Sequence, residues 1–317
     1  MTRLPRIGWL ADGKRLHLQD GPIDLIIEAR GTANNVRAAY EAAVRRFTGL
    51  LDMLCDELPE LRRAVHPDRC VLQGRVARRM HAAVAPFAAA SFITPMAAVA
   101  GAVAEEVLGA MTESADLKRA YVNNGGDIAL HLTDDERLTV GLVDDPAAPS
   151  LIGKTVIEAS DTIRGIATSG WHGRSFSLGI ADAVTVLART ASQADAAATI
   201  IANAVDLPGH PLIVRCPADE IQPDNDLGGR LATRDVGKLS HHEIAEALRA
   251  GISKAQVLLA MELIEGVALH LQGTTEVVGL KDLHSEVQLP RAGTTERPEN
   301  MLHVAMADTD IRGECVA

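Results

Sequence analysis

The chain has 317 residues, of which 47% are hydrophobic and 23% are charged, and its formal net charge is −11. This length can bury a full core, and the balance of apolar and charged residues is that of an ordinary globular protein. The negative charge argues against a nucleic acid as a partner, because affinity for a phosphate backbone needs clustered Lys and Arg. The densest basic group, Arg75, Arg78 and Arg79, is interpreted as a solvated helix face.

The first part of the chain predicts two strands followed by helices. The strands cover residues 15–19 and 23–29 and are separated by the turn sequence Asp20-Gly21-Pro22. Apolar residues then recur with helical spacing from residue 33 to residue 57, which predicts one long amphipathic helix. A second helix is predicted at residues 73–85.

Residues 82–104 contain no charged side chain and are long enough to span a bilayer. The segment consists mainly of Ala with Gly, Ser, Thr and two prolines, however, and its hydropathy is too low for a membrane helix. We therefore expect a buried segment of small residues and no contact with a membrane. Thr94 and Pro95 predict the N-cap and first residue of a helix over 95–111, whose start is a candidate anion site.

The second part of the chain mixes strands and helices. Strands are predicted at 120–132 (interrupted by a turn), 138–143, 155–158, 183–188 and 212–216, and helices at 193–205, 240–251 and 254–265. The lack of a strict βαβ alternation favours the α+β class, with mixed or antiparallel sheets packed by helices. We expect one domain over residues 1–280 and a polar, loosely attached extension over 281–317, with a loop at 290–295.

The four cysteines, Cys55, Cys70, Cys216 and Cys315, lie far apart and form no C-x-x-C pair. Neither a zinc site nor a disulfide framework is indicated, so we expect reduced and mostly buried thiols. The N-terminal residues contain no apolar stretch of signal-peptide length, which favours a cytoplasmic location.

Two glycine-containing segments carry polar residues suited to a ligand site. Asn123-Asn124-Gly125-Gly126-Asp127 is typical of a hairpin turn and shows nothing about function by itself. The segment Thr168-Ser169-Gly170-Trp171-His172-Gly173-Arg174-Ser175 is richer, because hydroxyls, an indole, an imidazole and a guanidinium fall in one loop. Arg174 could clamp a phosphate, Trp171 could stack on a ring and His172 could move a proton, although each also suits an ordinary surface loop.

Asp195 and Thr199 are four residues apart and would share one face of a helix, where they offer two hard oxygens to a metal ion. On spacing alone, a structural role for Asp195 and Thr199 is favoured over metal binding. Ser192 and Asp195 match a capping box at a helix start, and the Thr199 hydroxyl could bond to the carbonyl four residues back.

Four segments in this order resemble the ApbE superfamily of FAD:protein FMN transferases, and more closely its uncharacterised branch of ApbE-like cytosolic proteins. They are Ala97-Ala-Val-Ala-Gly101-Ala-Val-Ala, Val122-Asn-Asn-Gly-Gly-Asp127-Ile, Ala167-Thr-Ser-Gly170 and Ala194-Asp-Ala-Ala-Ala-Thr199. The resemblance extends from about Leu16 to Gly273.

The resemblance implies an ApbE-like fold with a ligand in a cleft and a set of site residues. In the transferases the Asp and Thr of the last segment hold Mg²⁺ beside the FAD pyrophosphate, which points to Asp195 and Thr199. The enzyme moves FMN onto a threonine of an acceptor protein. The implied residues for binding FAD or FMN are Asn124, Gly125, Gly126, Asp127, Thr168, Ser169, Gly170 and Arg174.

The chain also departs from the transferase pattern. Where the family has His-Ile-Ile-Asp-Pro-x-Thr-Gly, this chain has Gly179-Ile-Ala-Asp182-Ala, so the aspartate is present and the histidine is not. The family lysine of Gly-Ile-Ala-Lys-Gly has no counterpart near Gly101. The candidate catalytic residues are therefore Asp182 and His172.

Two functions follow: a protein that binds a flavin nucleotide or similar phosphate-bearing ligand without transfer, which we favour, and an Mg²⁺-dependent FMN transferase. The Ala-rich surfaces also permit a homodimer.

Overall fold

The structure is a computed structural model that describes residues 4–143, 151–279 and 301–303. Within these residues, one sheet has nine strands, and each neighbouring pair in it is antiparallel. In spatial order the strands are β1 (Arg6–Trp9), β2 (Leu16–Asp20), β3 (Ile23–Arg30), β4 (Arg119–Asn124), β5 (Asp127–Leu132), β8 (Gly165–Ser169), β9 (Ala183–Ala188), β12 (Gly266–Leu271) and β13 (Thr274–Val278).

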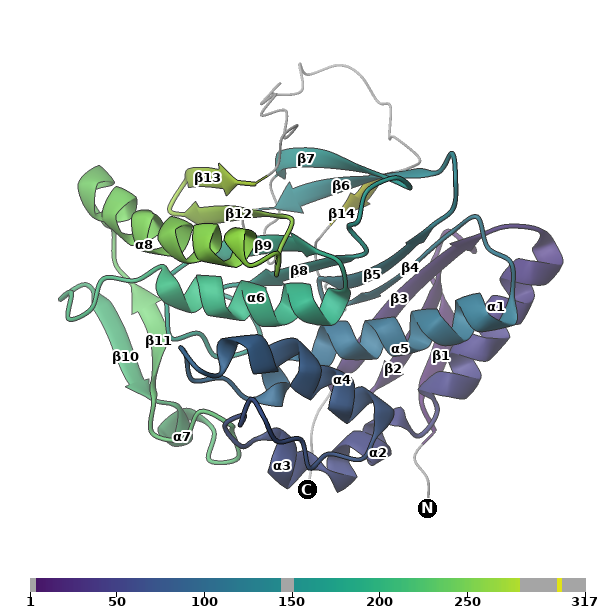
Figure 1. The fold of residues 1–317 in the computed structure, drawn as a ribbon, viewed down its shortest axis with the longest axis horizontal. Coiled ribbons are helices and arrows are strands. Elements are labelled where there is room, and N and C mark those ends of the chain that lie inside the picture. The colour runs from purple at the N-terminus through teal and green to yellow at the C-terminus, as the bar shows by residue number, and fades with distance from the viewer. Residues whose placement is uncertain (1–3, 144–150, 280–300, 304–317) are drawn as a thin grey trace.

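Helices cover one face of this sheet, as Figure 1 shows. The helices nearest the strands are α1 (Ala33–Phe47), α5 (Val99–Ser114), α6 (Ala191–Ala204) and α8 (His241–Ala260). Helix α4 (Arg75–Val84) packs against α5 and α6, and the short helices α2 (Leu50–Asp56) and α3 (Leu58–Leu61) precede it. Two 3₁₀ turns, η1 (Ala85–Phe87) and η2 (Pro95–Ala98), connect α4 to α5.

A smaller sheet covers the other face of the central strands. Strand β6 (Arg137–Val143) pairs with β7 (Leu151–Glu158) and with β14 (Met301–His303). Because successive strand residues point to opposite faces, the central strands must be apolar on both faces. In β5, Ile128 and Leu130 face this second core, while Ala129 faces the helices. A separate pair, β10 (Ile213–Pro217) and β11 (Leu231–Val236), carries the short helix α7 (Ala218–Ile221).

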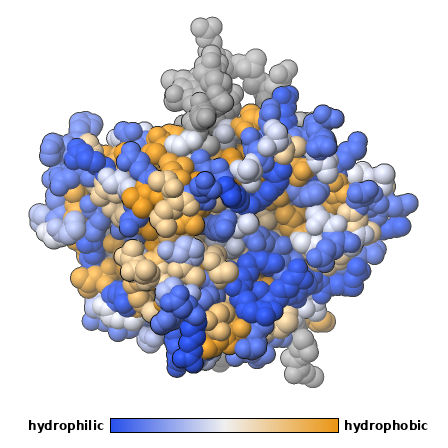
Figure 2. Space-filling model, viewed as in Figure 1, coloured by the Kyte–Doolittle hydropathy of each residue, from blue (hydrophilic) through white to orange (hydrophobic). Residues whose placement is uncertain are grey.

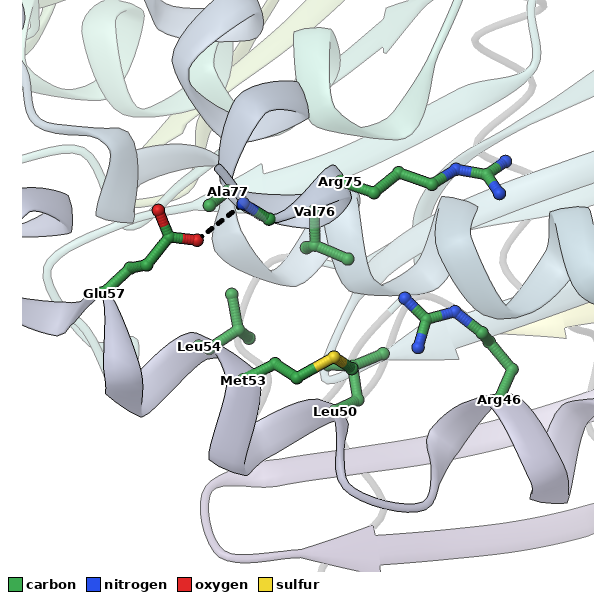
Figure 3. Close-up of a pocket in the computed structure, with 9 residues that line it drawn as sticks. Arg46, Leu50, Met53, Leu54, Glu57, Arg75, Val76 and Ala77 are labelled. Carbon is green, nitrogen blue, oxygen red and sulfur yellow. Dashed lines mark hydrogen bonds between the residues drawn. The ribbon is translucent and has the colours of Figure 1, made fainter. Parts of the chain in front are cut away.

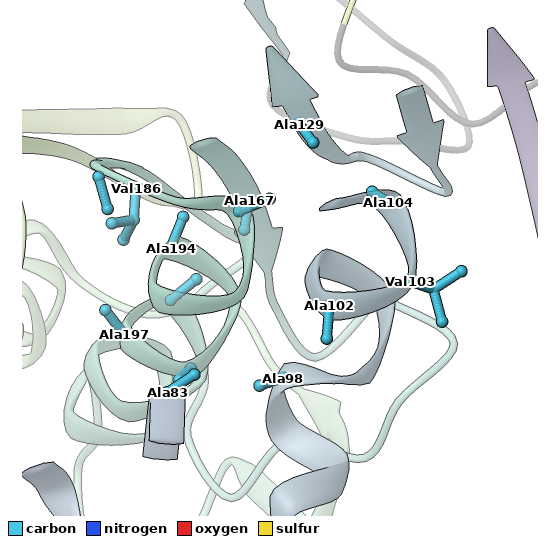
Figure 4. Packing of buried hydrophobic residues seen from close by; sticks show 14 of the residues in the cluster. Ala83, Ala98, Ala102, Val103, Ala104, Ala129, Ala167, Val186, Ala194 and Ala197 are labelled. Carbon is cyan, nitrogen blue, oxygen red and sulfur yellow. The ribbon is translucent and has the colours of Figure 1, made fainter. Parts of the chain in front are cut away.

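Small residues bring the backbones of α5, α6 and β8 into close contact. Figure 4 shows Ala98 and Ala102 on one side and Ala194 and Ala197 of α6 on the other. A Cβ atom on Gly101 of α5 would lie 2.3 Å from the Ala191 carbonyl oxygen. These contacts place the first turns of α5 and α6 side by side, which matters for the site described below.

The α+β class and antiparallel sheet predicted from the sequence are confirmed, with corrections to individual elements. The helix predicted over 33–57 ends at Phe47, because Gly49 adopts a left-handed φ of 78° and α2 starts in a new direction. The two helices predicted over 240–251 and 254–265 are the single helix α8, in which Gly251 provides space for Val205 and Leu269. Strands β1, β8, β11, β12, β13 and β14 were not predicted.

The Ala-rich segment is divided among α4, η1, η2 and α5, and the described residues include no helix with the length and hydropathy needed to cross a bilayer. Thr94 and Pro95 occupy the predicted N-cap and first positions, but of the 3₁₀ turn η2, which precedes α5. The Thr94 hydroxyl makes no capping bond and donates to the Asp226 carboxylate instead. Figure 2 shows hydrophilic and hydrophobic residues interspersed on this face of the molecule.

The expectation of mostly buried thiols is wrong for Cys55 and Cys70, which are exposed; Cys216 is partly buried, and all three are free. On α2 the buried residues are Leu50 and Leu54, one turn apart, and Cys55 is exposed. Cys315 and the predicted loop at 290–295 lie outside the described residues.

Candidate functional site

The β4–β5 hairpin has the turn that its sequence predicts. Gly125 and Gly126 have φ values of 64° and 109°, a region that L-residues with a side chain rarely adopt, and the Gly126 N–H donates to the Asn123 side chain at 2.8 Å. The Asn124 amide group donates to the Ala100 carbonyl at 3.2 Å. The turn is thereby fastened to the start of α5.

Asp195 lies on α6 and contacts the start of α5. Its carboxylate accepts a hydrogen bond from the Gly101 N–H at 3.0 Å. The capping interpretation is wrong, because the N-cap of α6 is Thr190, whose hydroxyl accepts from the Gln193 N–H at 3.3 Å. The anion site predicted at the start of α5 is occupied by the protein's own Asp195 carboxylate. It accepts a hydrogen bond from one of the N–H groups that have no partner within the helix, near the positive end of the helix dipole.

Asp127, at the start of β5, provides a second carboxylate beside Asp195. It accepts a hydrogen bond from the Thr168 N–H at 3.3 Å. Burial, together with the negative charge of Asp195, raises the pKa of Asp127 well above its usual value. Burial also raises the pKa of Asp195 to about 7, although the N–H groups of Gly101 and Ala100 oppose the shift. Two partly buried carboxylates that interact in this way need a proton or a cation to balance their charge.

Thr199 is partly buried one turn after Asp195 on α6. Within the described residues its hydroxyl makes no hydrogen bond, so the predicted alternative, a bond to the carbonyl four residues back, is not formed. No group of three or more His, Cys, Asp and Glu side chains suited to a metal ion occurs in the described part of the chain. The oxygens available to a hard cation here are those of Asp127, Asp195 and Thr199.

The loop after β8 runs beside the hairpin turn. The Thr168 hydroxyl pairs with the Thr185 hydroxyl at 2.9 Å, Ser169 is partly buried, and a Cβ on Gly170 would lie 2.1 Å from the Asp182 carbonyl oxygen. Arg174 reaches back to the turn: a Cβ on Gly125 would lie 2.3 Å from an Arg174 guanidinium nitrogen. The Arg174 charge also opposes the rise in the pKa of Asp127.

His172 and Asp182 meet in the same loop. The His172 Nε2 atom lies 3.2 Å from a carboxylate oxygen of Asp182, with side-chain exposures of 39% and 15%. The Trp171 indole N–H donates to the same oxygen at 3.1 Å, and the Gln272 N–H donates to the other oxygen at 2.6 Å. The rings of Trp171 and His172 are 3.8 Å apart. The structure thus brings together the two candidate catalytic residues.

Several contacts of the site could not be found from sequence patterns. Glu105 of α5 accepts the Ser192 N–H at 2.6 Å and pairs with Arg79 at 3.0 Å. Its neighbour Glu106, with only 1% of its side chain exposed, pairs with Arg79 at 2.6 Å and Arg46 at 2.8 Å. The interpretation of the 75–79 cluster as a solvated face is therefore wrong for Arg79. The only hint in the sequence was the pair Glu105 and Glu106, which directly follows the uncharged segment 82–104.

A small cavity lies away from these residues, between α2 and α4 (Figure 3). Its volume of about 20 Å³ has room for about one water molecule. Leu50, Leu54 and Val76 line it, and Glu57 at its edge accepts the Gly74 N–H at 2.7 Å. It includes none of the predicted site residues.

The fold and site define a class: an α+β protein whose antiparallel sheet is covered by helices and whose paired carboxylates lie at the start of α5. A family model described as "AbpE bacteria" matches residues 7–277. The chain belongs to this family, an uncharacterised ApbE-like family.

Curated relatives are each named "UPF0280 protein". The protein of Methanococcoides burtonii is 43% identical over 119 residues, which cover 37% of this chain and 48% of the relative. The protein of Methanopyrus kandleri is 38% identical over 163 residues, which cover 51% and 62%. The protein of Methanothrix thermoacetophila is 45% identical over 116 residues, which cover 36% and 46%. The chain thus spans about half the length of the curated relatives it matches.

Proposed function

We propose that this protein binds a flavin nucleotide, FAD or FMN, or a similar phosphate-bearing ligand together with Mg²⁺. The observation that carries the proposal is the pairing of Asp127 and Asp195, two partly buried carboxylates from different elements that lie close enough for the negative charge of Asp195 to raise the pKa of Asp127. The raised pKa values mean that the pair holds a proton when no cation is bound, and a bound cation would take the place of that proton and balance the charge of both carboxylates.

The residues present fit a magnesium ion. Mg²⁺ commonly uses one or two carboxylates, keeps several water molecules and completes its shell with substrate phosphates, so a third acidic side chain is not needed. Asp195 and the free hydroxyl of Thr199 would hold the ion, with Asp127 beside them. When bound, the ion neutralises charge on the ligand's phosphates.

The phosphates are assigned to the backbone of Gly125 and Gly126 and of residues 168–170, with Arg174 as the counter-charge. The contact of Arg174 with the Gly125 turn supports this assignment, since the guanidinium lies near enough to Asp127 to oppose the rise in its pKa. Asn124 and Thr168 have a different role. The Asn124 side chain bonds to the Ala100 carbonyl and fastens the turn, and the Thr168 hydroxyl bonds to Thr185 and fastens the loop; the ligand would contact both segments.

A second candidate function is transfer of FMN to a hydroxyl of an acceptor protein. The contact between His172 and Asp182 favours it, because it supplies an exposed imidazole although the family histidine before Asp182 is absent. The proposal also places the protein in the cytoplasm, assigns it a nucleotide ligand and permits a homodimer. Nucleic acids and membranes are not among the proposed partners.

Isothermal titration with FAD, with and without Mg²⁺, followed by chromatography for released AMP, tests the proposal. Magnesium-dependent binding supports it, and AMP release in addition supports the transferase alternative. Asp195→Asn should remove the magnesium dependence, while Asp52→Asn, an exposed change on α2, should not. Absence of binding of both FAD and FMN under all conditions would overturn the flavin assignment.

A further inference from the structure

We propose that His172 accepts the proton of the hydroxyl that attacks the ligand's phosphorus, and that Asp182 and Trp171 position its ring. This inference rests on the proposed function, specifically on its transfer candidate. It assigns different roles to the two residues that the sequence alone leaves as equal candidates.

Asp182 is already engaged by donors. One carboxylate oxygen accepts the Trp171 indole N–H at 3.1 Å and lies 3.2 Å from His172 Nε2, and the other accepts the Gln272 N–H at 2.6 Å. The Asp182 backbone N–H in turn donates to the His270 carbonyl at 3.0 Å. A carboxylate that receives donors on both oxygens and is 15% exposed is poorly placed to take a proton from a substrate. It acts as a positioning residue.

His172 has the complementary properties. Its Nε2 atom faces Asp182, so Nδ1 is the nitrogen left for a substrate, and the ring is 39% exposed. The Trp171 ring, 3.8 Å away and tilted by 36°, limits the rotation of the imidazole. An aspartate on one ring nitrogen and an open second nitrogen is the arrangement that lets histidine act as a general base.

Residues on both sides of His172 contact the hairpin turn and its carboxylate Asp127. Thr168, before it, contacts Asp127 through its N–H at 3.3 Å, and Arg174, after it, packs on Gly125 of the same turn. His172 lies between these two attachment points in a loop of a few residues. The loop that carries His172 is therefore attached at both ends of this stretch to the turn to which the phosphates are assigned.

The step balances without a further reactant. The hydroxyl oxygen, from water or from a side chain of an acceptor protein, bonds to the phosphorus of the FMN part of FAD. The bond from that phosphorus to the bridging oxygen breaks, and its electron pair leaves with AMP. The hydroxyl proton moves to His172 Nδ1. AMP appears whichever hydroxyl attacks, and free FMN distinguishes water from a protein acceptor.

The test measures AMP release from FAD and Mg²⁺ by the intact protein, with FAD affinity measured in parallel. His172→Asn should lower the rate by about 10²- to 10⁴-fold and leave the affinity for FAD unchanged. Imidazole added to His172→Ala should restore part of the rate, which a structural defect would not allow. Asp182→Asn and Trp171→Phe should lower the rate less. His241→Asn, an exposed change at the start of α8, is the matched control and should retain the full rate.

The outcomes separate this inference from the function beneath it. Loss of rate with imidazole rescue supports it. Binding of FAD without AMP release by the unaltered protein, or an unchanged rate in His172→Asn, overturns it and leaves the binding proposal standing. Absence of FAD binding overturns both.

Discussion

The Asp195 carboxylate on α6 accepts a hydrogen bond from the Gly101 N–H, near the start of α5, at 3.0 Å. The same glycine lets α6 come close, because a Cβ there would lie 2.3 Å from the Ala191 carbonyl oxygen. The residue that provides the amide therefore also provides the space, and the space depends on the absence of a side chain. The geometry of the carboxylate pair follows from this contact.

Gly101→Ala should destabilise the fold and disturb the site. The new Cβ would meet backbone atoms of Ala191 and Ser192, which cannot move without shifting α6, so we expect a loss of roughly 1–3 kcal/mol in the free energy of unfolding. Gly109→Ala on the same helix is the control, since a Cβ there meets nothing within 4 Å. It should gain up to about 1 kcal/mol. Urea unfolding measures both, and equal effects would contradict the packing argument.

The charge on Asp195 should make stability depend on pH. Burial raises its pKa from 3.8 to about 7, so between these values the unfolded chain binds fewer protons than the folded protein. The free energy of unfolding should therefore fall as the pH rises from about 4 to about 7. Asp195→Asn should reduce that slope, and Mg²⁺ should restore stability at pH 8 in the unaltered protein only. Thermal unfolding across the pH range tests this, and identical slopes would exclude the assignment.

Glu106→Gln should destabilise the protein by about 3 kcal/mol, because Arg46 and Arg79 would lose a buried counter-charge. Burial opposes ionisation of Glu106, but these arginines hold its pKa below the usual value, so its contribution to stability is lost as the pH falls. Glu113→Gln is the control. Glu113 is 68% exposed and pairs with Arg75 at 3.6 Å, so its loss should cost less than about 1 kcal/mol. Chemical denaturation of both variants measures the two losses, and equal losses would contradict the prediction.

Ser240→Ala should cost about 1 kcal/mol by removing the N-cap of α8. The Ser240 hydroxyl accepts the Glu243 N–H at 3.4 Å, and the Glu243 carboxylate accepts the Ser240 N–H at 2.7 Å. This backbone bond is the main reason that the pKa of Glu243 is lowered to about 2. Ser253→Ala, within the same helix, removes only a bond to the Arg249 carbonyl and should change stability by less than about 0.5 kcal/mol.

Arg174→Gln should weaken FAD binding about tenfold, the size expected for one charge-assisted hydrogen bond to a phosphate. The loss should shrink at high salt, because screening already reduces the contribution of an exposed charge. Arg78→Gln, an exposed change on α4, should bind FAD like the unaltered protein. Titration at two salt concentrations measures the difference, and equal affinities of the two variants would exclude Arg174 from the site.

The sequence alone determined the features that depend on neighbouring residues. Hydrophobic patterns predicted β2, β3 and α6, a short apolar run predicted β9 as a buried strand, and the glycine pair at 125–126 predicted the β4–β5 turn. These patterns work because backbone conformation and the burial of one face are largely local properties. The composition likewise indicated a globular protein, and the net negative charge argued against a nucleic acid as a partner.

The tertiary structure decided which residues meet. Asp195 matched a helix cap by spacing, yet it bonds to Gly101 on another helix, and Gly251 suggested a helix end but makes room for packing inside α8. Asp127, Asp195 and Arg174 come together only because β5, β8 and α6 pack side by side. Such contacts depend on the close packing of segments far apart in the chain, for which a local pattern carries no signal.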